Sequence, residues 1–296
     1  MLDICHDMER LCPNAFMLNY TNPMAMLCKA MQTYTKVDIT GLCHSVQGTS
    51  QMLSEWAGAD YKDVNYTCIG INHMAFFTEL TAKGVDLYPI LKSRIEEEKF
   101  YNKEKVRNEI FKTFGYYVTE SSGHNSEYTP WFRKRPDLIR KYCSPIGANG
   151  NPGEYAFSLN LRKDPNRFDN LVRSFMGKPL KKERGHEYAA NILNARIGSV
   201  ENLPYDACVE IPVTATKDGY IRKFQGKMPS NVAPLVAFTA GIENLVVEAW
   251  EKKSKQLVYQ AVSLDPLCSA VLSLQEIRDM CDELFEINED YLGDYQ

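Results

Sequence analysis

The chain has 296 residues, of which 44% are hydrophobic and 24% charged, and its formal net charge is −4 at pH 7. This composition is ordinary for a globular protein, and the slightly acidic balance gives no reason to expect a nucleic-acid or anionic-membrane partner. No apolar run approaches the roughly 18 residues that a membrane span needs, and the acidic N-terminus differs from a signal peptide. We therefore expect a cytoplasmic protein whose nine cysteines remain reduced thiols.

The first 57 residues alternate between helical and extended patterns. The apolar spacing predicts helices over 3–12, 24–33 and 45–57 and strands over 15–19 and 36–42. Strands joined through helices by short links indicate right-handed crossovers and a parallel sheet. We interpret residues 1–57 as the later half of a doubly wound, Rossmann-like sheet. No GxG occurs in the sequence, so the phosphate-binding turn of a dinucleotide fold is not expected within it.

The pattern changes after residue 57, and we assign 58–296 to a second, α+β domain. Its predicted strands cover 64–70, 75–81, 205–213 and 219–225, and its predicted helices cover 91–114, 136–143, 164–176, 187–196, 232–262 and 274–291. Residues 115–130 are expected to be irregular. Because polar side chains crowd this stretch and apolar anchors are few, it is typical of a binding loop.

Three predicted strands end in clusters of polar side chains: Asn19 to Pro23, Cys43-His44 and Asn72-His73. Ligands of open α/β sheets bind outside the carboxyl ends of the strands, so we expect the three clusters to form one site. A thiolate and an imidazole make an incomplete metal site, and catalytic metal sites keep positions open for water or substrate. From these residues alone, a buried structural cysteine and a core histidine are the simpler interpretation.

The motifs in order resemble glycoside hydrolase family 4, in particular its α-galactosidase branch. The resemblance covers essentially the whole chain and rests on Asn19–Pro23, Gly41–Ser45, Gly70–Met74, Asp86–Pro89, Thr119–His124, Ser126–Phe132, His186–Ala189, Ala207–Pro212 and Leu264–Leu267. It implies a doubly wound half-sheet followed by the C-terminal substrate, metal and oligomerisation domain of that family.

The resemblance also implies the chemistry. Family 4 is an exception to glycoside hydrolysis by two carboxylates, because its members use NAD and a divalent metal, usually manganese. In the implied reaction NAD takes hydride from C3 of the sugar and a base removes the C2 proton. The glycosidic oxygen then leaves, water adds and the hydride returns. An α-galactoside is the favoured substrate, and an α-glucosidase or α-galacturonidase is the nearest alternative.

Roles follow from the motifs residue by residue. The resemblance makes Cys43 and His73 the metal ligands and places Asn22 near the reacting hydroxyls of the substrate. Asn72, like Asn22, could orient a hydroxylated substrate, since an amide both donates and accepts hydrogen bonds. Asn19 is assigned to the cofactor.

The acid and the base are less sharply indicated. His44 stands where some relatives carry an aspartate that acts as the acid, and an imidazole can donate a proton near neutral pH. Tyr128 is the first choice for the C2 base, although an unperturbed tyrosine with a pKa of about 10 is a poor one. Glu120 and His124 are the alternatives. Arg133 is a candidate for a carboxylated sugar.

Two hypotheses from other functional classes stay open. One is a metal-independent dehydrogenase of the lactate or malate type, and the other is an inactive sugar-binding module. The expected partners are a small-molecule glycoside and, in the full-length protein, further copies in a dimer or tetramer. Because the family's Gly-rich NAD-binding segment is not found in this sequence, we expect a fragment that is unstable or inactive alone, with an unpaired sheet edge.

Overall fold

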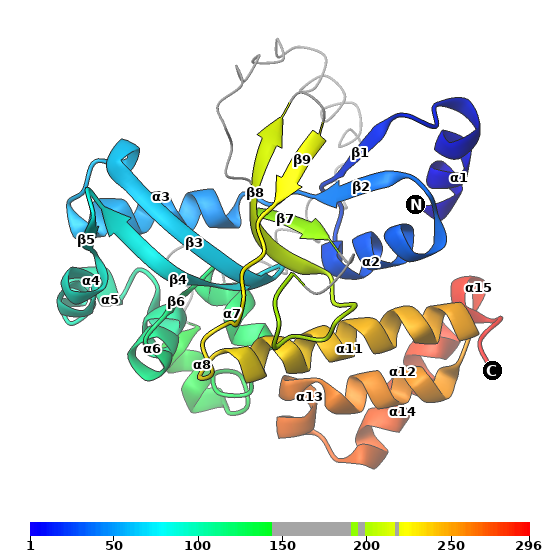
Figure 1. Cartoon of the computed structure of the whole chain (residues 1–296). Helices are drawn as coiled ribbons and strands as arrows, with labels where there is room; N and C mark the ends of the chain where they lie inside the picture. Colours follow the sequence, from blue (N-terminus) through cyan, green and yellow to red (C-terminus); the bar gives the residue numbers. More distant parts are fainter. Residues whose placement is uncertain (144–190, 195–198, 217–218) are drawn as a thin grey trace, which may run out of the picture.

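The computed structural model describes residues 1–143, 191–194, 199–216 and 219–296, and Figure 1 shows their arrangement. A single mixed sheet runs through the molecule, and the C-terminal helices lie beneath one half of it. The predicted helix 164–176 and His186 lie outside the described residues. In the part that is described, no helix is both long and apolar enough to cross a bilayer.

The N-terminal part confirms the predicted alternation of helix and strand. Its elements are α1 (Leu2–Leu11), β1 (Phe16–Asn19), α2 (Met24–Tyr34), β2 (Asp38–Gly41) and α3 (Ser45–Ala57). β1 and β2 pair in parallel, from Phe16 opposite Asp38 to Asn19 opposite Gly41. α3 begins directly after Cys43-His44 and ends at Gly58, whose left-handed backbone is the usual helix stop.

The middle of the chain is built on a hairpin of two long strands. Its elements are β3 (Val64–Ile71), β4 (Met74–Ala82), β5 (Val85–Asp86), α4 (Tyr88–Arg94), α5 (Glu98–Tyr101), α6 (Lys105–Phe114), β6 (Tyr117–Val118), α7 (Ser122–Tyr128) and α8 (Pro136–Tyr142), with the short 3-10 turn η1 (Tyr61–Asp63) before β3. The predicted helix over 91–114 is wrong, because three helices occupy it. The irregular stretch 115–130 is also wrong in part, since it contains β6 and α7.

The last part adds strands to the sheet and then a group of helices. Its elements are β7 (Asn191–Asn194), β8 (Val209–Thr216), β9 (Gly219–Arg222), α11 (Ala233–Lys252), α12 (Lys255–Leu264), α13 (Pro266–Val271), α14 (Leu274–Ile287) and α15 (Glu289–Leu292). The helix expected over 187–196 is wrong at 191–194, where the chain pairs with β2 and β8. The helix expected over 232–262 is interrupted at Lys253, which has a positive φ of 50°.

The strand order confirms a parallel pair in the N-terminal part and continues it with antiparallel strands. The order is β1-β2-β7-β8-β3-β4-β5, with β6 on β4 and β9 on β8. Each step from β2 through β7 and β8 to β3 is antiparallel, so β3 runs opposite to β2. Only the β1–β2 pair is parallel among the described strands. The division at residue 57 stays a prediction, and the sheet continues across it.

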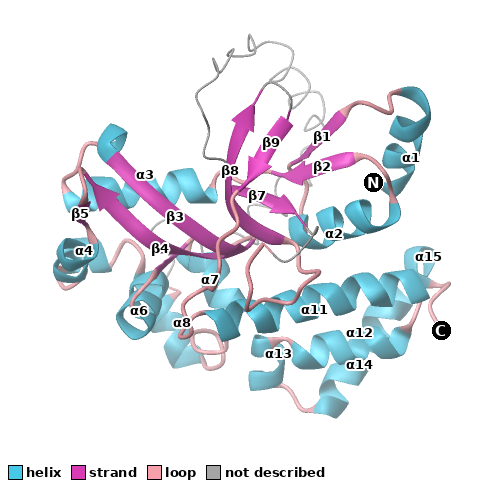
Figure 2. Cartoon of the chain, in the orientation of Figure 1, coloured by secondary structure: helices cyan, strands magenta, loops and turns pink. Residues whose placement is uncertain are grey.

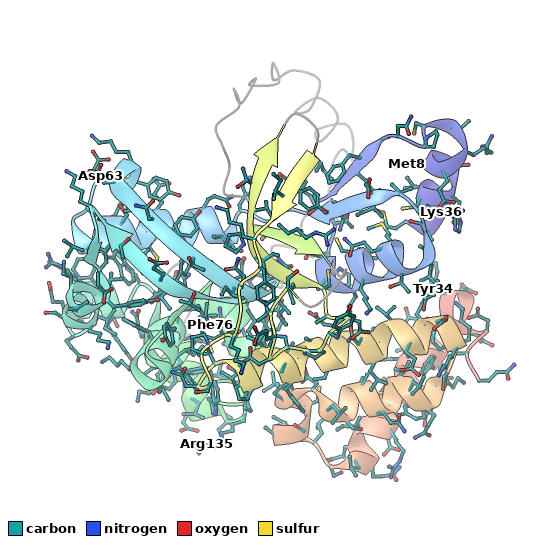
Figure 3. All side chains as sticks on the ribbon, in the orientation of Figure 1. Met8, Tyr34, Lys36, Asp63, Phe76 and Arg135 are labelled. Carbon is teal, nitrogen blue, oxygen red and sulfur yellow. The ribbon has the colours of Figure 1, made fainter. Side chains whose placement is uncertain are left out.

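Apolar side chains fill both faces of the β3–β4 hairpin. Because neighbouring residues of a strand point to opposite faces, Phe76 joins the cluster with Val236 of α11, while Phe77 joins the cluster with Leu53 of α3. A third cluster packs α1 and α2 on β2. Figure 2 shows the helices placed around the sheet, and Figure 3 shows Phe76 near the middle of the molecule. The β3–β4 hairpin is therefore packed against apolar side chains on both of its faces.

Candidate metal and catalytic site

Cys43 and His73 meet, as predicted from the strand ends. Cys43 follows β2, His73 lies in the connection between β3 and β4, and Cys43 Sγ is 3.6 Å from His73 Nε2. A row of paired residues, Gly41, Leu193, Glu210 and Gly70, crosses the sheet between them. Because this row puts both strand ends at one level, the two side chains approach although their strands run in opposite directions.

The β3–β4 connection is a two-residue hairpin turn, which fixes the position of His73. Ile71 pairs with Met74, so only Asn72 and His73 make the turn. His73 has a φ of 66°, a conformation uncommon for residues other than glycine. A Cβ on Gly70 would lie 2.4 Å from the Met74 carbonyl oxygen. The hairpin therefore requires glycine at position 70, and it holds His73 in a conformation that an open loop would not favour.

Glu120 supplies a third donor beside Cys43 and His73. Its Oε2 lies 3.5 Å from His73 Nε2 and 4.0 Å from Cys43 Sγ. The three donor atoms all lie within 4.8 Å of one another, and all three residues are partly buried. Glu120 also has a positive φ, 68°. Two of the three donors thus come from strained turns, a feature often found at functional sites.

Helix α7 brings two further predicted residues to this cluster. Tyr128 Oη lies 3.2 Å from His73 Nδ1. The His124 ring lies 4.9 Å from the His73 ring, and His124 Nδ1 is 3.6 Å from Glu120 Oε1. Ser121, the residue before the helix, holds His124 with a contact of 3.0 Å between its Oγ and Nδ1. The polar stretch predicted as a loop is therefore a capped helix that faces the cluster.

Burial and nearby charges shift the pKa values of His73 and Tyr128. Burial lowers the pKa of His73, and the Glu120 carboxylate opposes this only in part, so the imidazole is neutral and able to ligate. Burial first, and then the charges of Glu127, Glu120, Glu243 and Cys43, raise the pKa of Tyr128 to about 12. At neutral pH a smaller fraction of Tyr128 is therefore deprotonated, and able to act as a base, than of a free tyrosine.

The donor set fits a divalent transition metal. A thiolate, a neutral imidazole and a carboxylate are ligands that zinc, manganese and related ions accept. Three protein donors leave coordination positions open for a substrate, as catalytic sites require. His73 Nδ1 contacts Tyr128, and such a second contact orients a metal-bound histidine.

The predicted amide residues lie on the neighbouring strand ends. Asn19 is buried, and its amide bonds Thr21 and contacts the Cys28 thiol, so it is engaged inside the turn after β1. Asn22 is exposed, and its Oδ1 accepts a hydrogen bond from the Met24 N–H. Asn72 Nδ2 is buried and makes no hydrogen bond to any residue that the structure describes.

His44 and Arg133 occupy the margins of the site. His44 is exposed, and its ring lies 5.8 Å from that of Tyr20, which joins the end of β1 to the end of β2. Arg133 Nε donates to Ser126 Oγ at 2.7 Å, and its guanidinium pairs with Glu127 at 3.3 Å. Arg133 is therefore occupied by α7 itself, which weakens its case as a carboxylate receptor.

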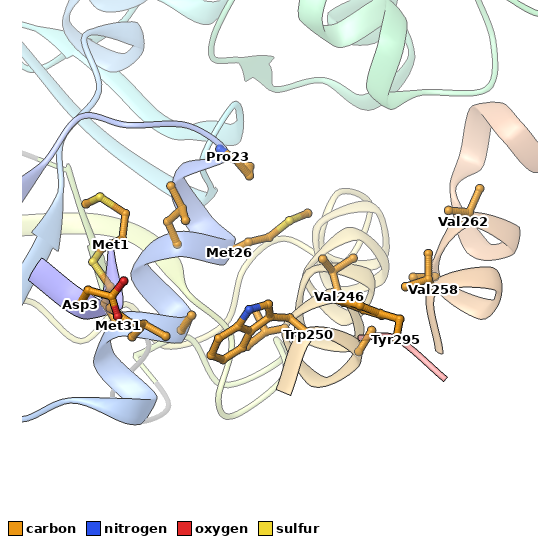
Figure 4. Close-up of a pocket in the computed structure, with 16 residues that line it drawn as sticks. Met1, Asp3, Pro23, Met26, Met31, Val246, Trp250, Val258, Val262 and Tyr295 are labelled. Atoms are coloured by element: carbon orange, nitrogen blue, oxygen red, sulfur yellow. The ribbon is translucent and has the colours of Figure 1, made fainter. Parts of the chain in front are cut away.

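An apolar pocket lies away from this cluster. This pocket of about 560 Å³ separates α1 and α2 from α11 and α12, with Met31, Trp250 and Val258 among its lining residues. Figure 4 shows these side chains facing one another across it. Neither Cys43 nor His73 lines this pocket.

Glu243 of α11 is a half-buried residue whose Oε2 is shielded from solvent, and the sequence analysis missed it. It follows Val236 and Ala240 and precedes Val247 on the buried stripe of the helix. Its Oε2 makes no hydrogen bond to any residue that the structure describes. Burial raises the pKa of Glu243 to about 8. The residue breaks an otherwise apolar helical period, and this was the one signal available in the sequence.

Comparison with known families agrees with this geometry. The family 4 glycosyl hydrolase model matches residues 1–59, and the family 4 glycosyl hydrolase C-terminal domain matches residues 68–268. The chain belongs to glycosyl hydrolase family 4. The resemblance inferred from the motifs is therefore confirmed at the level of the family.

Two family 4 relatives show the extent of the similarity. The chain is 38% identical over 315 residues to an alpha-galactosidase of Bacillus subtilis, covering 100% of this chain and 71% of that protein. It is 33% identical over 318 residues to an alpha-galactosidase of Rhizobium meliloti, covering 100% of this chain and 64% of that protein. An alpha-galacturonidase of Thermoanaerobacter italicus is more distant, at 25% over 321 residues, covering 98% of this chain and 71% of that protein.

Solved structures of family 4 share the fold. One is a 6-phospho-alpha-glucosidase from gut microorganisms in complex with NAD and Mn²⁺, with a TM-score of 0.73 at 18% identity over 99% of this chain and 71% of that one. Another is the 6-phospho-beta glucosidase of Thermotoga maritima with manganese, NAD⁺ and glucose-6-phosphate, with a TM-score of 0.68 at 20% identity over 98% and 69%.

Proposed function

We propose that this protein hydrolyses α-glycosides, with α-galactosides favoured, in a reaction that depends on NAD and a divalent metal such as manganese. The observation that carries the proposal is the convergence of Cys43, His73 and Glu120 within 4.8 Å. The higher identity to two alpha-galactosidases than to an alpha-galacturonidase supports the choice of sugar. Two structural neighbours are described as complexes with NAD and manganese, which supports the cofactors.

The metal ligands would be Cys43, His73 and Glu120. NAD and a Lewis-acidic cation would supply reversible oxidation of the sugar and stabilisation of the negative charge that develops beside the ketone. Glu120 thereby changes role relative to the sequence interpretation, which listed it as an alternative base. Its carboxylate lies among the ligand atoms, so we propose it as a ligand.

Tyr128 is the proposed base for the C2 proton. Its hydroxyl contacts His73 Nδ1, so it lies beside the proposed metal ligands. Burial first, and then nearby carboxylates, raise the pKa of Tyr128 to about 12, and a cation held by His73 would act in the opposite direction. His124 and His44 are the proposed proton donors, with His124 nearer to the cluster. Asn22 and Asn72 are proposed to bind sugar hydroxyls.

Asn19 is proposed to act on the cofactor through the turn after β1 rather than by a free amide, because its amide is engaged there. We also retain the division of the chain into 1–57 and 58–296 and a homo-oligomeric state as proposals. A reducing compartment such as the cytoplasm suits a site that needs Cys43 as a thiolate.

The deciding experiment is hydrolysis of p-nitrophenyl α-galactoside by the full-length protein under reducing conditions, with and without NAD and Mn²⁺. We expect activity that needs both additions and that falls at least about 10³-fold in Cys43→Ser. Cys12→Ser is the matched control, because Cys12 is an exposed free thiol at the end of α1. Activity indifferent to NAD would overturn the mechanism. Binding of galactose by a folded but inactive chain would favour a sugar-binding module.

A further inference from the structure

A buried ion pair at the start of α6 contacts the two helices that follow the proposed metal ligands Cys43 and Glu120. Glu104 and Arg107 form a two-point contact, with Oε1 2.8 Å from Nη2 and Oε2 2.9 Å from Nε. Their side chains are only 14% and 4% exposed. A buried ion pair gains little net stability, because desolvation offsets the attraction. Net stability therefore explains the pair poorly, and its contacts with α3 and α7 provide another explanation.

The Glu104 carboxylate holds the beginning of α7. Its Oε2 accepts hydrogen bonds from the Ser122 N–H at 3.0 Å and from the Ser122 hydroxyl at 2.7 Å. A negative charge at a helix N-terminus satisfies its free N–H groups. Glu120 lies two residues before this contact, so fixing Ser122 restricts the backbone turn with positive φ that directs the Glu120 carboxylate to the cluster.

The Arg107 guanidinium reaches the other side. Its Nη1 donates to Thr49 Oγ1 at 3.0 Å, and Thr49 lies on α3, the helix that begins directly after Cys43-His44. One ion pair thus contacts the helix that follows Cys43 and the helix that follows Glu120. Burial acts to lower the pKa of Arg107, and the nearby Tyr117, Glu104 and Glu120 outweigh it, so the guanidinium stays charged.

We propose that the Glu104–Arg107 pair is a positioning clamp that fixes Cys43 and Glu120 relative to each other through Thr49 and Ser122. This inference rests on the proposed metal site and adds residues that do not touch the metal. Outer contacts of this kind typically change metal affinity by about 10- to 100-fold when they are removed.

The test is Co²⁺ titration of the whole chain, followed by the thiolate-to-cobalt absorption band. Glu104→Gln is expected to weaken Co²⁺ binding about 10- to 100-fold, but it leaves Arg107 buried without its carboxylate partner and can impair folding. Ser122→Ala and Thr49→Val are milder, because each removes one link and keeps the ion pair. For each of them we expect a loss of about 3- to 10-fold, below the range for complete removal of an outer contact.

A double-mutant cycle distinguishes positioning from general stabilisation. If the clamp acts through Glu120, Ser122→Ala has no further effect on Co²⁺ affinity in a Glu120→Gln background. Ser273→Ala is the matched control, since Ser273 caps α14 far along the chain and its loss lowers stability without a contact to the cluster. Native affinity in both Ser122→Ala and Thr49→Val, or full additivity with Glu120→Gln, overturns the clamp.

A separate result would overturn the metal site itself. If the native chain shows no band, or if the band persists in Cys43→Ser, the ligand assignment fails and the clamp fails with it. If the band depends on Cys43 but is unchanged in the Ser122 and Thr49 variants, only the clamp fails.

Discussion

Two regions of the molecule differ in character. One is the polar cluster around Cys43, His73 and Glu120, where donor atoms lie within 4.8 Å of one another. The other is the apolar pocket of about 560 Å³ between the helices that carry Met31 and Trp250. The pocket offers volume but few polar groups, whereas the cluster offers coordinating atoms held by turns and hydrogen bonds. The comparison teaches that converging side-chain chemistry, rather than cavity size, identifies the site.

The largest expected effect is a loss of turnover at the polar cluster. Tyr128→Phe removes the hydroxyl beside His73 Nδ1, and loss of a general base typically lowers kcat by about 10²- to 10⁴-fold. We expect that loss of turnover at saturating metal, together with Co²⁺ binding weaker by about 10- to 100-fold in absorption titration, because the contact that orients His73 is removed. Tyr61→Phe, at a hydroxyl that contacts Ser50, is the control. Native turnover in Tyr128→Phe would transfer the role of base to another residue.

The next effect tests the strained turn beneath the polar cluster. Gly70→Ala puts a Cβ 2.4 Å from the Met74 carbonyl oxygen, and overpacking of this kind costs about 1–3 kcal/mol. We expect a lower free energy of unfolding by urea and weaker Co²⁺ binding, because His73 moves with the turn. Gly48→Ala is the control, since nothing lies within 4 Å of its Cβ position. Equal behaviour of the two variants would show that the turn does not position His73.

The third effect concerns Glu243 and depends on pH. Its folded pKa of about 8 lies above the ordinary value of 4.5, so the unfolded chain loses this proton first as the pH rises. The contribution of protonated Glu243 to the free energy of unfolding is therefore fully present below about pH 4.5, and it declines as the pH rises toward 8. Glu243→Met removes this dependence and should gain about 1–3 kcal/mol at pH 8.

Urea unfolding at pH 5 and pH 8 measures this difference. The gain from Glu243→Met should be larger at pH 8 than at pH 5. Glu248→Met is the control, because Glu248 is more exposed and forms a surface pair with Lys252. An equal gain at both pH values would mean that Glu243 does not titrate in this range.

The smallest effect falls on the apolar pocket. Trp250→Ala removes a ring that packs 5.5 Å from Tyr34, but the side chain is 38% exposed. We expect a loss of about 1–2 kcal/mol in thermal or urea unfolding, with Co²⁺ affinity and turnover per folded molecule unchanged. A change in metal affinity would contradict the independence of the apolar pocket from the polar cluster.

The local elements near the N-terminus were predictable because their signals are local. Pro13 and Gly58 mark helix ends, and the short β-branched and aromatic runs mark β1 and β2. By contrast, 191–194 reads as a helix in isolation but pairs with β2 and β8. The breaks between α4, α5 and α6 contain no proline or glycine. Strand pairing and packing with distant residues determine the secondary structure at these positions, and a local sequence pattern does not contain that information.

The site was predictable only in part for the same reason. Cys43 and His73 stand in motifs that resemble the family, and Tyr128 was found through the polar stretch. Glu120 was noticed, but its place as a third donor depends on a positive φ and on the position of α7. The contacts of Glu104 with Ser122 join residues 18 positions apart, and no spacing rule in the sequence indicates them.

The order β2-β7-β8-β3 has a consequence for synthesis on the ribosome. β2 and β3 follow each other in the chain, yet the sheet places between them two strands that are made more than 100 residues later. Contacts so distant in sequence form slowly, because a long loop must close before they stabilise anything. Cys43 and His73 therefore reach their final distance only after residue 216 has been translated. Until then the emerging chain has the proposed ligands but not the proposed site, and metal binding should report that β7 and β8 have joined the sheet.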